Sequence, residues 1–327
     1  MSVRPFVEGD LPHVLDLLEA SLGGGPTGRR SAQFFRWKHF DNPFGPSLLL
    51  VAEHEARLIG LRAFMRWRFR AAGRPLRAVR AVDTATHPDY QGMGVFSRLT
   101  RVALDAMAGE VDLVFNTPND KSGPGYLKLG WREVGRVPVA VRVRRPLRLA
   151  AGRRARARPE PPAAAAPAVR SLGATGPLAR LLEQEPPPRR LATPRTIDYL
   201  RWRYGAAPLL GYRAVTEESG GDLAGLALFR VRRRGRLLET TITEVLAGGD
   251  AGTARRLLRR VAAAAPTDHL TLHAPARSSL ARAAMGSGFL PSPAGIRLVV
   301  KPLVAGIQPD PSNLGAWELS LGDLEVF

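Results

Sequence analysis

The apolar residues of the first half of the chain follow helical spacing in some segments and strand spacing in others. Apolar side chains three or four positions apart predict amphipathic helices over 10–22 and 93–107, the first with Asp10 as its N-cap. Short or alternating apolar runs predict strands. The predicted order is strand 3–7, helix 10–22, helix 34–40, strands 47–53, 58–69 and 76–86, helix 93–107, strand 111–116, helix 122–129 and strand 131–143. This order predicts an α/β fold with a mixed central sheet flanked by helices.

The same pattern occurs a second time further along the chain. Five pairs of segments match in the same order in both copies: 35–38 with 200–203, Pro43 with Pro208, 59–61 with 224–226, 129–131 with 287–289, and 145–147 with 301–303. The spacing between the copies falls from 165 to 158 residues between the third pair and the fourth. A tandem duplication explains this order, and the second copy lacks a short stretch that the first copy holds in this interval.

Four segments follow from the repeat and from local composition. Residues 1–147 are predicted to form a first domain and residues 170–305 a second, as a length of 327 residues also suggests. Between them, 148–169 is rich in Arg, Pro and Ala and predicts an exposed linker. Residues 306–327 form a C-terminal tail that ends in acidic and apolar residues.

Composition excludes several kinds of chemistry. The chain has no cysteine, which rules out disulfides, a cysteine nucleophile and thiolate metal sites. Its six histidines show no HxxxH spacing, so we predict no metal site. No apolar stretch is long enough for a membrane helix, and residues 1–10 have no apolar signal region. We therefore expect a cytoplasmic protein with no membrane partner.

The net charge of +19 is carried almost wholly by arginine and has two interpretations. One is a polyanionic partner such as nucleic acid, and the other is a general habit of a chain rich in Arg, Ala, Gly and Pro. The arginine-rich segment 142–158 has no interleaved aromatic residues on which bases could stack. We interpret it as a solvated segment and do not expect nucleic acid as a partner, although a non-enzymatic basic nucleic-acid-binding protein stays an alternative.

One loop, between strand 76–86 and helix 93–107, suggests a ligand site. Gly92 and Gly94 lie in it, and the lack of a Cβ lets a ligand approach the backbone closely. The following helix presents unpaired N–H groups at the positive end of its dipole. Such a loop suits a pyrophosphate, whereas a tight turn from strand to helix is the purely structural alternative.

This loop resembles motif A of the GNAT acetyltransferases, which is Gln/Arg-x-x-Gly-x-Gly/Ala after a central strand. Gln91, Gly94 and the preceding residues 87–90 match that motif. Phe96 departs from it, because the family usually has a small residue there. A bulky residue at this place is similar to the tandem GNAT proteins of the Eis type.

A second segment resembles motif B of the same family. It contains Asn116, then Tyr126 on a predicted short helix, then the pair Gly130-Trp131. The resemblance covers 1–147 directly and 170–303 only through the repeat. It therefore implies a tandem GNAT fold, with the acyl-CoA loop in the first domain and a degenerate second domain.

The resemblance also implies an activity, the transfer of an acetyl or other acyl group from acyl-CoA to a primary amine by direct attack. The co-substrate-binding residues that it implies are Thr84, Ala85 and Thr86 at the thioester, Gln91, Gly92, Met93, Gly94, Val95 and Phe96 at the pyrophosphate, and Asn116 and Asn119 at the pantetheine arm. Tyr126 is implied as the catalytic acid, since a phenol keeps its proton at neutral pH and can donate it to a thiolate.

The general base stays open at this point. Asp83 is our second catalytic candidate, while His87, Glu133 and the terminal carboxylate of Phe327 are further ones. In the second copy, Asp250 follows two glycines and would oppose a phosphate, so we expect no acyl-CoA there.

The acceptor also stays open, between a small-molecule amine and a peptide amine. An alternative enzyme is a transferase of the Fem type, which takes its acyl group from aminoacyl-tRNA. Such folds generally lack a CoA loop, whereas the segment from Gln91 to Gly94 is complete here.

Overall fold

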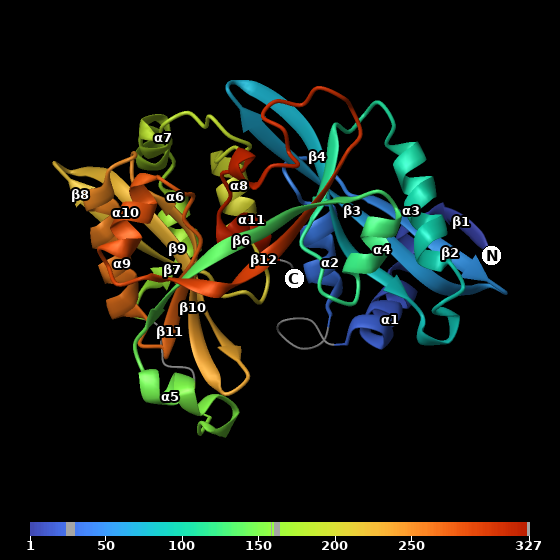
Figure 1. Ribbon diagram of the computed structural model, residues 1–327, viewed down its shortest axis with the longest axis horizontal. Helices are drawn as coiled ribbons and strands as arrows, with labels where there is room; N and C mark the ends of the chain where they lie inside the picture. Colours follow the sequence, from blue (N-terminus) through green and yellow to red (C-terminus); the bar gives the residue numbers. More distant parts are fainter. Residues whose placement is uncertain (24–29, 158, 160–163, 326–327) are drawn as a thin grey trace. The chain divides into compact units, whose positions relative to one another are not determined.

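A computed structural model describes residues 1–23, 30–157, 159 and 164–325 of the chain (Figure 1). The described residues form two compact units. We call residues 1–135 together with 297–316 the N-terminal unit, and residues 136–296 together with 317–325 the C-terminal unit. Among the described residues, no helix is both long and apolar enough to cross a membrane.

The N-terminal unit is built on a mixed sheet. Its strands are, in spatial order, β1 (Ser2–Pro5), β2 (Leu48–His54), β3 (Arg57–Ala71), β4 (Arg74–Thr86), β5 (Leu113–Asn116) and the end of β12 (Leu290–Pro302). Only β4 and β5 run parallel to each other within this set of pairs. The parallel pair needs a crossover, and α3 (Val95–Ala106) supplies it.

Helices cover both faces of this sheet. Alternate residues of β2, such as Leu50 and Ala52, pack in one apolar cluster with Val95 and Leu99 of α3 and with α4 (Gly123–Lys128). The intervening residues of β2 are also buried, because β3 and β4 pack against α1 (Leu11–Leu22) on their other side. The short helix α2 (Ala32–His39) packs beside α1.

The C-terminal unit repeats this plan. Its strands are, in spatial order, β6 (Arg132–Val143), β11 (His269–Leu272), β10 (Leu237–Leu246), β9 (Asp222–Arg234), β8 (Arg213–Ser219) and β7 (Ala166–Pro167). Its helices are α5 (Pro146–Ala151), α6 (Ala168–Gly173), α7 (Thr175–Gln184), α8 (Ile197–Leu200), α9 (Ala251–Ala264), α10 (Ser279–Met285) and α11 (Leu321–Leu324). The helices α9 and α10 pack on one face of the sheet, as α3 and α4 do in the first unit.

Each unit takes its last strand from the other half of the sequence. The strand β6 pairs with β11 through residues 140–143, and β12 pairs with β5 through residues 299–302. The predicted linker 148–169 contains α5, a 3-10 turn (Gly152–Arg154) and β7, while its residues 158 and 160–163 lie outside the described ones.

The sequence repeat has a direct structural counterpart. A Cβ at Gly60 of β3 would lie 2.6 Å from Val95 and 2.9 Å from Leu99 of α3. A Cβ at Gly225 of β9 would lie 2.7 Å from Thr253 and 2.9 Å from Leu257 of α9. In both units, therefore, the matched glycine lets the crossover helix rest directly on the strand. The predicted fold class, an α/β fold with two similar halves, is confirmed.

Candidate active site

The loop between β4 and α3 leaves a helix N-terminus open. Gly92 and Gly94 have φ values of 79° and 76°, in the left-handed region that glycine adopts at little cost. Gly94 is the N-cap of α3 and provides no side-chain hydrogen bond to the first turn. A Cβ at either glycine would meet no atom within 4 Å. The first N–H groups of α3 are thus uncapped beside open space, as an anion site requires.

The predicted pyrophosphate residues occupy this loop. Gln91, Gly92, Met93 and Gly94 are exposed, whereas Val95 is buried against the sheet. His87 caps the turn Pro88–Tyr90 by accepting from the Asp89 N–H, and its Nε2 lies 2.7 Å from Arg57 Nη2. These contacts give His87 a structural role in the loop.

The strand β4 has a bulge just before this loop. Leu61 pairs with Ala85 and Ala63 pairs with Val82, so Asp83 and Thr84 together oppose one residue of β3. Asp83 has a φ of 41°, which is rare for a residue with a side chain. Thr86 pairs with Gly60, and its carbonyl accepts a hydrogen bond from the Ser21 hydroxyl. The bulge re-aims the side chains of β4 at the place where the resemblance puts the thioester.

Asp83 is held by Lys38 and His39 of α2 and by Arg30, whose Nη1 lies 3.4 Å from the Asp83 carboxylate. Its carboxylate lies 2.8 Å from Lys38 Nζ and 3.0 Å from His39 Nε2, and all three side chains are buried. Burial alone would raise the pKa of Asp83, but the Lys38 charge and the His39 hydrogen bond hold that pKa well below its ordinary value. Burial lowers the pKa of His39, so its neutral ring donates from Nε2 and accepts at Nδ1 from the Ser47 hydroxyl, 2.9 Å away.

Tyr126 lies on the opposite, α3 and α4, side of the sheet. It is 4% exposed, and its ring packs edge-on against Phe96 and Trp131. Its hydroxyl oxygen accepts a hydrogen bond of 2.9 Å from Arg62 Nη1, which also donates to Thr84 Oγ1 in the bulge. The two predicted catalytic residues, Tyr126 and Asp83, are therefore both next to the bulge but approach it from different helical layers.

Phe96 and Asn116 complete this side of the site. A Cβ on Gly125 would lie only 3.1 Å from the Phe96 ring, so the bulky residue of α3 is matched by a glycine in α4. Asn116, at the end of β5, is buried, and its Oδ1 has no hydrogen-bond partner among the described residues. Asn119 differs, because its Oδ1 already accepts from the Lys121 and Ser122 N–H groups.

Sequence reasoning missed three residues of this region, namely Lys38, His39 and Arg62. Arg62 had a visible signal, since it is the one charged residue in the apolar run 58–65 of β3. Lys38 and His39 had none, because a basic residue near the end of a predicted helix normally faces solvent. Glu133 is exposed and forms an ion pair with Arg297, and Phe327 lies outside the described residues.

The equivalent loop of the C-terminal unit is filled by the protein's own carboxylates. Asp250 caps α9 by accepting from the Gly252 and Thr253 N–H groups. Glu185 Oε1 accepts from the Ala247 and Gly248 N–H groups at 2.6 and 2.7 Å. The anion site that is open at α3 is thus occupied at α9.

The C-terminal unit also lacks counterparts of the hydrogen-bonded side chains Arg62 and Tyr126. The repeat aligns Arg62 with Ala227, at a spacing of 165 residues, and Tyr126 with Ala284, at a spacing of 158. The backbone supports the second match, because Trp131 N–H bonds to the Tyr126 carbonyl as Phe289 N–H bonds to that of Ala284.

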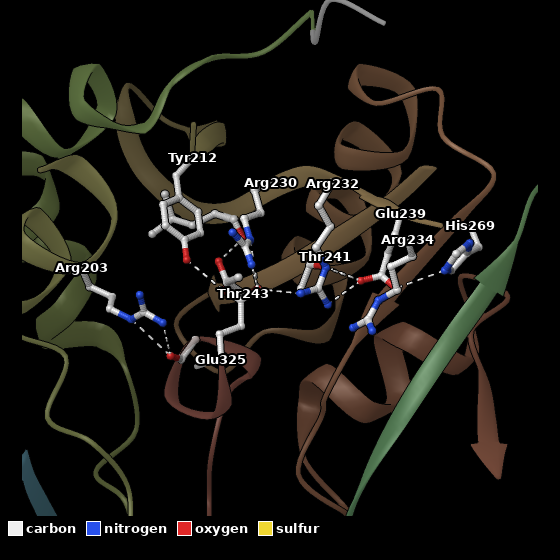
Figure 2. Close-up of polar contacts among 12 residues, drawn as sticks. Arg203, Tyr212, Arg230, Arg232, Arg234, Glu239, Thr241, Thr243, His269 and Glu325 are labelled. Atoms are coloured by element: carbon white, nitrogen blue, oxygen red, sulfur yellow. Dashed lines mark hydrogen bonds and ion pairs between the residues drawn. The ribbon is translucent and has the colours of Figure 1, made fainter. Parts of the chain in front are cut away.

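A different polar network holds the tail of the chain in the C-terminal unit (Figure 2). Glu325 accepts from the Tyr212 hydroxyl at 2.8 Å and from Arg230 Nε at 3.0 Å, and Arg203 donates to the Gly322 carbonyl. Further along the same face, Glu239 bonds to His269 at 3.2 Å and to arginines of β9. The acidic residues of the tail thus bind arginines of this unit.

Comparison with known proteins gives one family match and several similar structures. Residues 2–134 match the family described as "Acetyltransferase (GNAT) domain". No curated protein matches the chain. Among solved structures, a GCN5-related N-acetyltransferase from Anabaena variabilis has a TM-score of 0.63 at 11% identity, covering 93% of this chain and 73% of that one. Eis1 from Mycobacterium abscessus has a TM-score of 0.59 at 15% identity, with 93% and 74% covered.

The family match and the two similar halves define a fold. Residues 2–134 match a GNAT acetyltransferase domain, and the chain as a whole has the fold of these GNAT structures, with two similar halves. The family match supports acyl transfer as its chemistry.

Proposed function

We propose that the protein is an acyl-CoA-dependent N-acyltransferase that transfers an acetyl or other acyl group to a primary amine. The observation that carries the proposal is the uncapped start of α3 at Gly92 and Gly94, in the same unit as a buried Tyr126 at the β4 bulge. An anion site and a proton donor are the two groups that this reaction needs from the protein.

The residues present fit an acyl-CoA molecule. The N–H groups at the start of α3 would hold the pyrophosphate, because they are uncapped and face open space. The buried Oδ1 of Asn116, which has no partner among the described residues, would accept from an amide N–H of the pantetheine arm. The bulge at Thr84 and Ala85 would lie along the thioester.

When bound, acyl-CoA supplies an acyl carbon already activated as a thioester. Tyr126 gives its proton to the departing sulfur, since a hydroxyl that accepts from Arg62 keeps its own proton free to donate. The backbone of the bulge polarises the acyl carbonyl. Phe96 and Trp131 pack edge-on against the Tyr126 ring, which leaves Tyr126 4% exposed.

We assign Asp83 to positioning rather than to proton abstraction. A carboxylate whose pKa lies well below its ordinary value is a weak base, and Lys38, His39 and Arg30 already contact that of Asp83. Asp83 therefore anchors α2 to the bulge, and the amine loses its proton to solvent. The acceptor that we propose is a small-molecule or peptide amine.

The second unit, in this proposal, binds no acyl-CoA. Asp250 and Glu185 already satisfy the N–H groups of its loop and first helical turn, and a phosphate would meet two carboxylates there.

Calorimetric titration with acetyl-CoA tests the proposal. We expect micromolar binding by the wild type and its loss in Gly94→Asp, where a negative side chain enters the phosphate site. Gly109→Asp is the matched control, since Gly109 has a φ of 78° and open space but lies beyond the other end of α3. Absence of binding by the wild type, to acetyl-CoA and to longer acyl-CoAs, would refute the proposal.

A further inference from the structure

Arg62 is a buried cation without a counter-ion. Its side chain is fully inaccessible to solvent, and no carboxylate of the described residues forms an ion pair with it. Its Nη1 donates to Tyr126 and Thr84, whereas its Nε and Nη2 are buried and have no partner among the described residues. A buried charge that is neither paired nor fully hydrogen-bonded costs several kcal/mol, so this arrangement calls for a reason other than stability.

Aromatic rings fix the guanidinium in place. Its Cζ lies 4.4 Å from the ring centroid of Phe64, 5.2 Å from that of Phe96 and 5.1 Å from that of Tyr126. The negative faces of such rings attract a cation but form no hydrogen bonds in the plane of the guanidinium. The Phe96 that departs from motif A thus contacts both Arg62 and Tyr126.

The pair of Arg62 and Tyr126 occurs only in the unit whose loop before the crossover helix is open, among the described residues. The aligned positions in the other unit are Ala227 and Ala284, and both are buried. The fold therefore forms without either polar group, and the sheet and helix of that unit pack with alanine in their places. An arginine and a tyrosine that are needed only beside the anion site have a role in chemistry there.

We propose that Arg62 is the positioning residue of the proton transfer from Tyr126. This inference rests on the proposed function. Arg62 donates to the hydroxyl oxygen and so turns the O–H bond of Tyr126 away from itself, toward the ligand. It is also the counter-charge for the phenolate that forms when that proton leaves.

The amine nitrogen forms a bond to the acyl carbon, the C–S bond breaks, and its electron pair stays on sulfur. Sulfur takes the proton of Tyr126, which leaves a phenolate beside Arg62. The amine nitrogen loses a proton to water, and the phenolate regains one from water before the next turnover.

The test compares three single variants with the wild type in steady-state kinetics, using acetyl-CoA and an amine that the wild type accepts. We expect Tyr126→Phe to lower kcat by about 100-fold, as loss of a general acid does, and Arg62→Met to lower it by about 10- to 100-fold. Calorimetric Kd values for acetyl-CoA should stay within about threefold, because neither group contacts the phosphates. Arg62→Lys should recover part of kcat, since it restores the charge without the fork.

A double-mutant cycle separates positioning from a structural effect. In the Tyr126→Phe background, Arg62→Met should change kcat by no more than about twofold, because no phenol remains to be positioned. Arg80→Met is the matched control, since Arg80 is equally buried in β4 and donates to Thr117. It should leave the kcat of the folded protein near the wild-type value.

Two results would overturn the inference. One is an Arg62→Met variant that keeps wild-type kcat, and the other is an Arg62→Met effect of equal size with and without Tyr126. Failure of the proposed function itself would appear differently, as a wild type that neither binds acetyl-CoA nor acylates any amine.

Discussion

The Nε2 of His39 lies 3.0 Å from the Asp83 carboxylate, and this bond has a counterpart in the other unit. Tyr204, 165 positions after His39, donates to Glu244 at 3.2 Å. Asp83 and Glu244 both lie at the bulge of the strand that precedes the crossover helix. Tyr204 lies in the helical turn Arg201–Gly205 that follows α8, in the segment that the repeat aligns with α2. A hydrogen bond from this segment to a carboxylate at the bulge therefore belongs to the repeated fold and does not depend on an open anion site.

Asp83→Asn tests the structural role of this carboxylate. We expect the free energy of unfolding to fall by about 3 kcal/mol, because the variant leaves Lys38 buried without its anion. Burial already lowers the pKa of Lys38, so loss of its proton limits the cost. Urea denaturation measures the change, and kcat of the folded variant should fall less than about tenfold.

Asp89→Asn is the control for this prediction. Asp89 is 71% exposed and lies 3.5 Å from His87 Nδ1 and 4.0 Å from Arg57 Nη1, so its loss should cost less than about 0.5 kcal/mol. A stable Asp83→Asn protein with a loss of kcat of three orders of magnitude would instead make Asp83 the base.

Glu244→Gln should change how stability depends on pH. Burial raises the pKa of Glu244 to about 7, with Arg195 opposing the shift and Asp323 adding to it. Between pH 4.5, which is the ordinary pKa of the unfolded carboxyl, and about pH 7, the folded protein holds a proton on Glu244 that the unfolded chain releases. The stabilisation by this proton is complete below pH 4.5 and is lost as the pH rises to about 7. The free energy of unfolding of Glu244→Gln, relative to that of wild type, should therefore rise by about 3 kcal/mol as the pH rises from 4.5 to about 7.

Unfolding curves at several pH values measure this difference. The comparison is made between variant and wild type, because burial lowers the pKa of His39 and His273 and gives both proteins an opposite slope below pH 6.5. Glu218→Gln, an exposed position on β8, is the control. A difference between Glu244→Gln and wild type that does not vary with pH would contradict the prediction.

Gly60→Ala and Gly225→Ala should each destabilise the protein by about 1–3 kcal/mol, because the new methyl group pushes on the crossover helix. Only Gly60→Ala should also weaken acetyl-CoA binding, since it displaces the start of α3. Gly9→Ala and Gly173→Ala, where a Cβ meets nothing within 4 Å, are the controls. Equal loss of binding in both variants would show that the two units respond together.

Acetyl-CoA should bind with a stoichiometry of one per chain. Glu185→Ala removes the acceptor of the Ala247 and Gly248 N–H groups, and it should lower the free energy of unfolding by about 2 kcal/mol without adding a binding site. Calorimetry gives the stoichiometry and urea denaturation the stability, with Glu183→Ala as the exposed control. A second binding event, in wild type or variant, would place acyl-CoA in both units.

Much of the fold could be predicted from the sequence because it is encoded locally. Hydrophobic spacing predicted α1, α3 and the strands of the first half to within a few residues. Asp10 is an exception, since it precedes α1 but binds Arg4 and the Val7 N–H instead of capping the helix. Which donor a carboxylate chooses depends on the neighbouring strand, which sequence spacing does not reveal.

Part of the candidate site, too, could be predicted from the sequence, and part of it depends on the tertiary structure. The sequence by itself determined the Gly92–Gly94 loop, the repeat that pairs Gly60 with Gly225, and the presence of Tyr126, since each is recognised from short segments of the chain. The tertiary structure decided which strands complete each unit, which carboxylates fill the second loop, and that Arg62 of β3 meets Tyr126 of α4. Those contacts join residues far apart in sequence, and only the packing of helices on a bulged sheet brings them together.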